Sequence, residues 1–345
     1  MKKKIIVTGG LGYIGSHTTI ELIKEGYQVI ILDSLINTSI EMLYRIEEIT
    51  GEKPMFYQVD LSDSLALNNV KSQLEGAAGV IHFAALKAVG ESTEKPLDYY
   101  RNNLFSLINM IEMTREKNIS NFVFSSSATV YGAPESLPLT EASPVKEALS
   151  PYGNTKKVGE EILKDLSSTN RDFKVVSLRY FNPIGAHPSG KIGELPNGVP
   201  NNLMPFITQT AAGERKELLV FGADYKTPDG TAIRDYIHVE DIAKAHVKTL
   251  ERLISDKQKA NYEVFNLGTG KGYSVLEVIN SFEKTTKTKL PYRIVERRNG
   301  DVEEMFASTV LANKELNWKA TRSLDEMTSS SWYWEKKLRS NLNKK

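Results

Sequence analysis

The sequence contains no cysteine among its 345 residues. It therefore has no disulfide, no thiolate metal ligand and no cysteine nucleophile, which fits a reducing compartment. An excess of charge of either sign is also missing, because 44 lysines and arginines face 43 acidic residues and leave a net charge of +1. That balance gives no electrostatic reason to expect nucleic acid or an anionic membrane as a partner.

Long apolar runs are missing as well, and no window approaches the roughly 20 apolar residues that a membrane-spanning helix needs. The lysines at 2–4 resemble the start of a signal peptide, but the apolar stretch behind them, 5–7, is too short for its hydrophobic part. These absences predict a cytoplasmic protein. Apolar residues still make up 40% of the chain, and 345 residues are more than one core usually serves.

Short apolar runs alternate with amphipathic stretches through the first half of the chain. Predicted strands cover residues 4–8, 28–33, 56–60, 79–84, 121–126 and 174–181, and predicted helices cover 14–24, 65–74, 97–117 and 152–166. Such alternation is typical of right-handed βαβ units, and strands that are apolar throughout indicate a sheet covered on both faces. We therefore expect an α/β fold with a Rossmann-type, doubly wound parallel sheet.

The composition of the sequence changes near Asn182. Residues 183–205 hold five of the thirteen prolines and four glycines, which is typical of a domain boundary followed by loop-rich structure. Helical and strand patterns return at 239–253, 262–268 and 275–284. We predict a first domain over residues 1–182 and a smaller α/β domain over residues 183–345, from which some elements return to the first domain.

A glycine-rich turn follows the first predicted strand and opens the first predicted helix. Gly9, Gly12 and Gly15 allow a tight turn, and the helix N-terminus offers free N–H groups to a pyrophosphate. Asp33 ends the second predicted strand, 18 residues after Gly15, where a carboxylate binds ribose hydroxyls and repels a 2′-phosphate. Alone, the glycines could be an ordinary turn and Asp33 a helix cap. Together they predict a dinucleotide site that prefers NAD to NADP.

Tyr152 and Lys156 lie four residues apart in a predicted helix and therefore share one face. A tyrosine with a pKa of about 10 is a poor base at pH 7, but a nearby ammonium and the positive nicotinamide of oxidised NAD both favour the phenolate. Tyr152 is then a candidate general base towards a sugar hydroxyl. Ser127 follows the fifth predicted strand, at the edge where open parallel sheets bind ligands. Each residue alone is more often a surface or turn residue; behind the glycine turn they predict catalysis.

The five histidines are His17, His82, His187, His238 and His246. They show no His-x-x-x-His or Glu-x-x-His pairing, so we expect structural roles for them and no metal site. The sequence also has no Gly-x-Ser-x-Gly elbow of a serine hydrolase.

The Gly-x-x-Gly-x-x-Gly spacing, Ser127 and Tyr152-x-x-x-Lys156 together resemble the extended short-chain dehydrogenase/reductase family. The resemblance implies that the first domain binds NAD and that Ser127, Tyr152 and Lys156 are catalytic. It assigns these residues to the cofactor: Gly9, Gly12, Tyr13, Ile14, Gly15, Asp33, Asn37, Asp60, Leu61, Phe83, Ala84, Lys87, Asn102, Ser125, Tyr152, Lys156 and Phe181. Without the resemblance, Lys87 would be assigned to a solvated loop and Asn102 to an ordinary helix surface.

Longer blocks of sequence resemble UDP-glucose 4-epimerases. They cover residues 9–17, 81–92, 124–132, 179–190, 200–205, 229–238 and 315–327. Ser127-Ala128-Thr129 stands where related 4,6-dehydratases carry Thr-Asp-Glu, which argues against dehydration. The resemblance implies reversible epimerisation at C4 of UDP-glucose and UDP-galactose through a 4-keto intermediate, with tightly bound NAD.

The resemblance places a UDP-hexose substrate mainly in the second domain. The residues assigned to it are Lys87, Ser127, Tyr152, Asn182, Asn202, Leu203, Leu219, Phe221, Arg234, Arg298, Asp301 and Met305. Arg234 and Arg298 would neutralise the diphosphate, although an isolated arginine more often forms a surface ion pair. Family members pair through two helices of each subunit, here 97–117 and 152–166, which predicts a homodimer.

Met305 leaves the width of the sugar pocket open. Family members restricted to glucose and galactose carry a tyrosine there, and members that accept N-acetylated sugars carry a small residue; methionine is intermediate and flexible. The alternatives are therefore a UDP-N-acetylglucosamine/UDP-N-acetylgalactosamine 4-epimerase, an enzyme of dual specificity, or a sugar-nucleotide decarboxylase. A non-catalytic NAD-dependent binding protein is a further alternative, against which the intact Ser127, Tyr152 and Lys156 argue.

Overall fold

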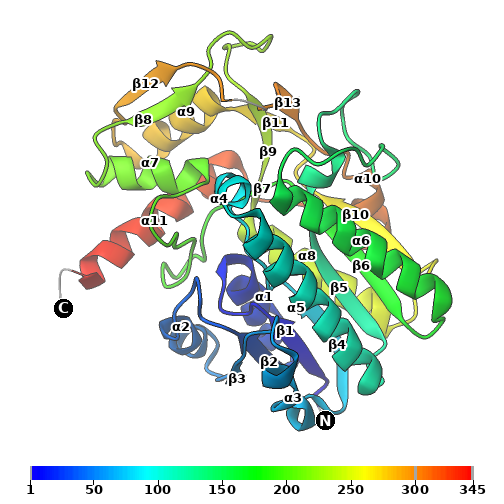
Figure 1. The fold of residues 1–345 in the computed structure, drawn as a ribbon. Coiled ribbons are helices and arrows are strands. Elements are labelled where there is room, and N and C mark those ends of the chain that lie inside the picture. The colour runs from blue at the N-terminus through cyan, green and yellow to red at the C-terminus, as the bar shows by residue number, and fades with distance from the viewer. Residues whose placement is uncertain (1, 299–300, 343–345) are drawn as a thin grey trace.

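A computed structural model describes residues 2–298 and 301–342 and is built around a seven-stranded sheet (Figure 1). From edge to edge the strands are β10 (Tyr262–Leu267), β6 (Lys174–Tyr180), β5 (Asn121–Ser127), β4 (Ala77–His82), β1 (Lys4–Thr8), β2 (Gln28–Asp33) and β3 (Met55–Gln58). All neighbouring strands pair in parallel. The strand order reverses between β1 and β4, where sheets of this kind bind ligands. The predicted Rossmann-type sheet is confirmed.

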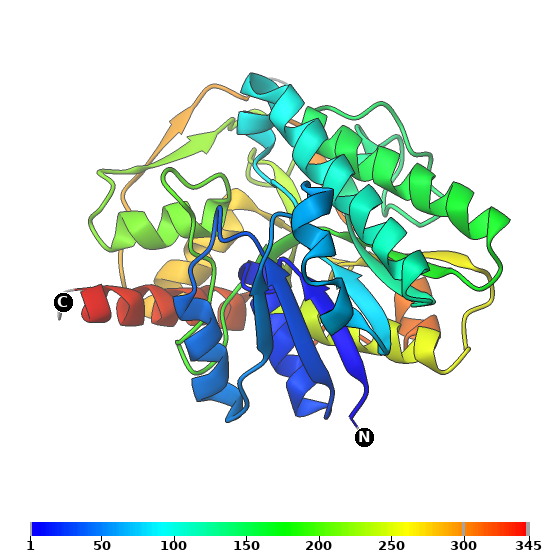
Figure 2. The ribbon, with the colours of Figure 1, turned by 60° about the horizontal axis from the view of Figure 1, so that its bottom comes forward.

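Helices cover both faces of the sheet (Figure 2). One face packs against α1 (Tyr13–Lys24), α2 (Glu41–Thr50), α8 (Val239–Ile254) and α10 (Val310–Glu315); the other packs against α3 (Ser64–Asn68), the 3₁₀ helix η1 (Lys71–Leu74), α5 (Pro96–Glu116) and α6 (Pro151–Thr169). Side chains alternate between the two cores: Ile5 and Val7 belong to the first and Ile6 to the second. Because both faces are buried, the strands read as continuous apolar runs.

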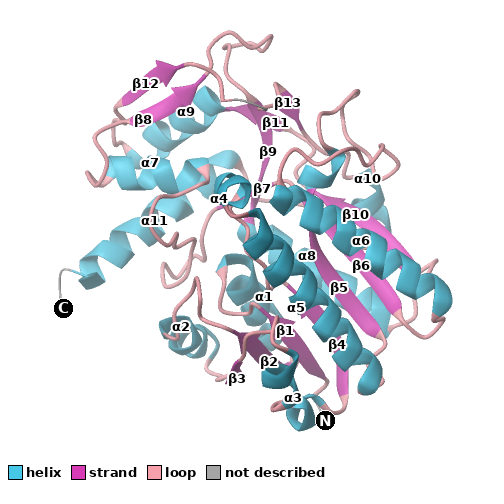
Figure 3. Ribbon diagram, in the orientation of Figure 1, coloured by secondary structure: helices cyan, strands magenta, loops and turns pink. Residues whose placement is uncertain are grey.

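A smaller group of elements begins directly after β6. It contains a sheet formed by β7 (Asn182–Ile184), β9 (Ile233–His238), β11 (Gly272–Ser274) and β13 (Glu304–Met305), and a parallel pair formed by β8 (Leu218–Phe221) and β12 (Tyr292–Val295). Helices α7 (Leu203–Ala211), α9 (Val275–Thr286) and α11 (Leu324–Leu342) enclose a separate core with these strands (Figure 3). This group lies next to one end of the central sheet. The predicted site lies at the same end.

None of the helices within residues 2–298 and 301–342 combines the length and apolar composition that crossing a membrane requires.

Candidate active site

The turn between β1 and α1 is shaped by glycine. Gly9 has a φ of +64°, and a Cβ there would lie 2.9 Å from the backbone nitrogen of Ala84. A Cβ on Gly15 would collide with the carbonyl oxygen of Gly9. Gly12 is the N-cap of α1, and within the described chain no side chain caps that end, so its N–H groups remain available. The turn is a backbone cradle of the kind that holds a pyrophosphate.

Asp33 fixes this turn to the end of β2. Its Oδ2 accepts the backbone N–H of Leu11 at 3.1 Å, and its Oδ1 accepts that of Leu35 at 3.0 Å. Burial raises the pKa of Asp33, and the two N–H donors oppose that shift. Each carboxylate oxygen keeps a second acceptor position, which suits the predicted contact with ribose hydroxyls.

The segment after β4 runs alongside the glycine turn. The backbone N–H of Phe83 donates to the carbonyl oxygen of Thr8 at 3.1 Å, and that of Ala84 donates to the Thr8 hydroxyl at 3.3 Å. Lys87 is exposed, and its Nζ lies 3.1 Å from Glu194 Oε1. The short helix α4 (Val89–Glu94) follows. Three of the predicted cofactor residues thus lie on one loop beside the cradle.

Asn103 holds this loop and was not singled out from the sequence. Its Oδ1 accepts the N–H of Leu86 at 2.8 Å, while its Nδ2 donates to the Leu86 carbonyl and the Thr155 hydroxyl, each at 3.0 Å. The neighbouring Asn102, which was predicted to contact the cofactor, donates to Asn103 Oδ1 at 2.9 Å. A polar residue in a helix carries no signal that distinguishes such a clamp from a solvated position.

The other predicted cofactor residues lie around the same edge. Asn37 and Asp60 are exposed, and Asp60 Oδ1 accepts the backbone N–H and hydroxyl of Ser62. Leu61 and Phe181 are buried, and Ile14 packs against the core of its sheet face. The hydroxyl of Tyr13 donates to the carbonyl oxygen of Gly185 at 2.6 Å and thereby reaches the smaller part of the molecule.

Ser127 and Tyr152 are brought together by two helix starts. Helix α6 begins at Pro151, and its N-cap Ser150 accepts the N–H of Gly153 at 3.1 Å, which places Tyr152 in the first turn. Ser127 is the N-cap of the 3₁₀ helix η2 (Ala128–Tyr131) and accepts the N–H of Thr129 at 3.2 Å. The Ser127 hydroxyl hydrogen is therefore free to donate, and the Ser127 hydroxyl beside Tyr152 lowers the pKa of the phenol.

Lys156 lies one turn further along α6 and is buried. Its Nζ donates to the carbonyl oxygen of Ser125 at 2.7 Å and lies 5.9 Å from the centroid of the Tyr152 ring. Burial lowers the pKa of Lys156 to about 7, opposed by the charge of Glu160. Burial also raises the pKa of Tyr152 to about 12. Burial thus opposes the phenolate, and its stabilisation by Lys156 together with oxidised NAD stays a prediction.

A buried ion pair that was not foreseen supports β5, the strand that ends at Ser127. Arg179 donates from Nε and Nη2 to the two carboxylate oxygens of Glu160, at 2.9 and 2.6 Å. Ser126 donates its hydroxyl to Glu160 Oε1 at 2.5 Å. Ser126 and Arg179 face each other in the β5–β6 register, so the pair ties both strands to α6. In the sequence, the pair is indicated only by Arg179, a charged residue within the apolar run of β6.

The predicted substrate residues of the second half form two contacts among themselves. Arg234, on β9, forms an ion pair with Asp301. The guanidinium carbon of Arg298 lies 3.9 Å from the centroid of the Phe221 ring. Each predicted diphosphate ligand is thus oriented by another predicted substrate residue.

The remaining substrate residues border these contacts. Met305, on β13, lies opposite Arg234 and packs against the cluster that contains Ala128, the residue after Ser127. Leu219 is exposed on β8. Asn182 begins β7, Leu203 begins α7, and Asn202 is the N-cap of α7, with its Nδ2 2.7 Å from Glu194 Oε1.

The histidines make contacts of a structural kind. His82 Nδ1 lies 3.0 Å from the Thr8 hydroxyl, and His246 Nε2 lies 2.8 Å from the Tyr180 hydroxyl. Burial lowers the pKa of His82 to about 3 and that of His246 to about 4. Among the described residues, no group of three or more histidines and carboxylates is arranged to hold a metal ion.

Known proteins are similar to this chain in sequence and in fold. The model of the NAD dependent epimerase/dehydratase family matches residues 5–268. The UDP-glucose 4-epimerase of Bacillus subtilis is 51% identical over 331 residues, which are 96% of each chain. A crystal structure of UDP-glucose 4-epimerase from Stenotrophomonas maltophila, with bound NAD and formylated UDP-arabinopyranose, has a TM-score of 0.95 and 45% identity and covers 98% of this chain and 99% of its own. The enzyme from Bifidobacterium longum, in complex with NAD+ and UDP, has a TM-score of 0.92 and 46% identity, over 97% and 98%.

Proposed function

The chain belongs to the NAD-dependent epimerase/dehydratase family, and on that basis we propose that it catalyses the reversible C4 epimerisation of UDP-glucose and UDP-galactose, with NAD as its cofactor. The observation that carries the proposal is that Ser127, Tyr152 and the buried Lys156 converge at the sheet edge that also holds the glycine cradle. The sequence relatives are UDP-glucose 4-epimerases, so the alternative of an enzyme restricted to N-acetylhexosamines is not favoured.

The residues of the cradle and of α6 fit NAD. Gly9, Gly12 and Gly15 would hold its pyrophosphate, Asp33 its adenosine ribose and Lys156 its nicotinamide ribose. Bound there, NAD would supply a hydride acceptor for C4 of the hexose and, once reduced, the hydride donor for the 4-keto sugar. An ammonium has three N–H donors, and because Ser125 takes one, Lys156 keeps two for the ribose and the phenol.

Tyr152 moves the proton of the reaction. As the phenolate, it takes the proton of the C4 hydroxyl while the C4–H bond breaks, so the C4–O bond becomes a carbonyl. The Ser127 hydroxyl donates a hydrogen bond to that oxygen. After the 4-keto sugar has turned over, Tyr152 returns the proton to the same oxygen. Because burial raises the pKa of Tyr152, the phenolate requires the positive charge of the oxidised nicotinamide in addition to Lys156.

The smaller part of the molecule would hold the UDP group while the hexose stays free to turn. Arg234 and Arg298 carry the charge that a diphosphate requires, and Asp301 and Phe221 orient them. We assign residues 183–345 to UDP-sugar binding and residues 1–182 to NAD binding, with β10 as a later strand of the central sheet and α8 as a later helix packed against it.

We further propose a homodimer formed through α5 and α6. Three apolar side chains of α5 share one face and are exposed: Leu97 by 65%, Phe105 by 52% and Ile108 by 37%. A contiguous exposed apolar face marks a surface that a partner can cover. Sedimentation velocity at micromolar concentration should give the dimer mass, and Phe105→Glu should give the monomer. A wild-type monomer would contradict the dimer.

A cytoplasmic location stays a prediction, which fractionation of the source cells tests.

The function is tested by incubating the purified protein with UDP-galactose and no added NAD, and following UDP-glucose by NMR. We expect conversion to the equilibrium mixture. Failure both without and with added NAD would contradict the proposal. UDP-N-acetylgalactosamine, tested beside it, shows whether Met305 admits an N-acetyl group.

A further inference from the structure

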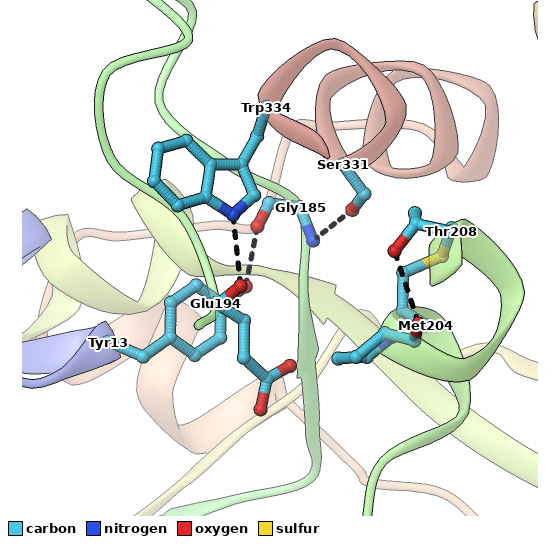
Figure 4. Close-up of a pocket in the computed structure, with 8 residues that line it drawn as sticks. Tyr13, Gly185, Glu194, Met204, Thr208, Ser331 and Trp334 are labelled. Atoms are coloured by element: carbon cyan, nitrogen blue, oxygen red, sulfur yellow. Dashed lines mark hydrogen bonds between the residues drawn. The ribbon is translucent and has the colours of Figure 1, made fainter. Parts of the chain in front are cut away.

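Residues 185–194 form a strap between the two parts of the molecule. The Gly185 carbonyl oxygen accepts the Tyr13 hydroxyl at 2.6 Å, and the Gly185 N–H donates to the Ser331 hydroxyl at 3.1 Å. At the other end, the Glu194 carbonyl oxygen accepts the indole N–H of Trp334 at 2.9 Å (Figure 4). The strap is thus fixed to α1 on the nucleotide side and to α11 on the substrate side.

The strap is also closed on itself and tightly packed. Ala186 and Gly193 form an antiparallel bridge, and the His187 N–H donates to the Ile192 carbonyl at 3.1 Å. A Cβ on Gly193 would lie 2.5 Å from the indole of Trp334. Glu194 therefore leaves the strap from a fixed backbone position, which makes the direction of its side chain well defined.

The Glu194 carboxylate joins two predicted ligand residues from opposite sides of the site. Its Oε1 accepts Lys87 Nζ at 3.1 Å and Asn202 Nδ2 at 2.7 Å. Lys87 belongs to the loop beside the glycine cradle, and Asn202 is the N-cap of α7 in the substrate part. One oxygen atom therefore links the cofactor loop to a residue predicted to contact the sugar nucleotide.

Burial distinguishes this contact from an ordinary surface ion pair. The Glu194 side chain is 11% exposed, whereas that of Lys87 is 57% exposed. Exposed ion pairs contribute little to stability. A mostly buried carboxylate that accepts hydrogen bonds from two donors fixes the positions of both donor side chains. Lys87 keeps two N–H donors and Asn202 keeps one N–H and its carbonyl for ligands. Glu194 thus orients both side chains without taking their capacity to bind.

We propose that Glu194 is a positioning residue that couples NAD binding to UDP-sugar binding through Lys87 and Asn202. The proposal rests on the function proposed above for the site itself. Because Lys87 and Asn202 contact ligands and not the reacting C4 atom, their contribution is equal in the ground state and the transition state. Loss of Glu194 should therefore change KM rather than kcat.

Glu194→Ala and Glu194→Gln test the coupling in the NAD-loaded enzyme. Because hydrogen bonds to charged groups are involved, we expect Glu194→Ala to raise KM for UDP-galactose about tenfold and to leave kcat within about threefold. Glu194→Gln keeps an acceptor for Asn202 but loses the charge opposite Lys87. Its KM should therefore lie between that of the wild type and that of Glu194→Ala. Glu48→Gln is the matched control, because Glu48 pairs with Lys191 of the same strap at 2.8 Å on the exposed surface; it should behave as wild type.

NAD retention measures the coupling without any turnover. UDP should slow the loss of NAD from the wild type during dialysis, and this protection should disappear in Glu194→Ala and persist in Glu48→Gln. An unchanged KM and full protection by UDP in Glu194→Ala would overturn the proposal, as would equal losses in Glu48→Gln. A wild type that protects NAD but does not epimerise would contradict the proposed function and leave the coupling intact.

Discussion

The ammonium of Lys156 binds the backbone carbonyl oxygen of Ser125 at 2.7 Å, and so ties helix α6 to the end of strand β5. The same ammonium lies 5.9 Å from the centroid of the Tyr152 ring. This hydrogen bond fixes the position of the Lys156 ammonium. From that position the ammonium can interact with the phenol and with the predicted nicotinamide ribose. The chemistry of the phenol depends on groups placed around that point.

Tyr152→Phe tests the assigned base. The variant lacks the group that moves the proton, so kcat should fall about 10²–10⁴-fold, the range of general acid–base catalysis. Its ring still fills the same volume, so NAD should remain bound at wild-type stoichiometry. Turnover is measured by NMR and NAD by absorbance after denaturation; a near wild-type rate would refute the assignment.

Gly15→Ala tests the glycine cradle. Since the added methyl group collides with the Gly9 carbonyl oxygen, the turn must shift and NAD should be lost on purification. Gly90→Ala is the control, because the nearest atom to its Cβ is 3.9 Å away. Full NAD occupancy in Gly15→Ala would show that the pyrophosphate does not rest on this turn.

Met305 tests how the sugar pocket is bounded. It packs against the cluster that contains Ala128, the residue after the predicted catalytic Ser127, so its volume should limit the substituent that the hexose carries. Met305→Gly should raise the ratio of kcat/KM for UDP-N-acetylgalactosamine to that for UDP-galactose, and Met305→Tyr should lower it. Identical ratios in all three proteins would remove Met305 from the pocket wall.

Acid stability should reflect the buried histidines. Burial lowers the pKa of His17, His82 and His238 to about 3 and that of His187 and His246 to about 4. Below pH 6.5 the unfolded chain binds protons that the folded protein does not. The free energy of unfolding should therefore fall as pH decreases from 6.5 towards 4, by up to about 1.4 kcal/mol per pH unit for each histidine.

Urea unfolding at pH 7.5, 6.5 and 5.5 measures this dependence. His246→Gln removes one histidine and should make the dependence shallower. Equal stability at all three pH values would contradict the buried, neutral state of the histidines.

The central sheet was predictable because its strands are buried on both faces. Residues 4–8 and 28–33 were predicted with the bounds that β1 and β2 have. The predicted helix at 65–74 is instead divided into α3 and η1, which follow an Asp63 cap. The strands β7, β11 and β13 are only two or three residues long, so no hydrophobic period could reveal them.

The site was predictable where the chemistry depends on residue type and spacing, and not where it depends on tertiary contacts. The Tyr152–Lys156 spacing predicted a shared helix face, but not that burial would raise the pKa of the phenol. Glu160 and Glu194 belong to no sequence motif that would have indicated their roles. Their roles follow from the partners that the fold brings to them from distant segments.

Label transfer from UDP-galactose carrying deuterium at C4 tests the central claim most directly. If Tyr152 moves only the hydroxyl proton and the hydride is returned within the same site, UDP-glucose should form in ordinary water, without added NAD, and keep deuterium at C4. Loss of the label to water, or a requirement for stoichiometric NAD, would contradict the account.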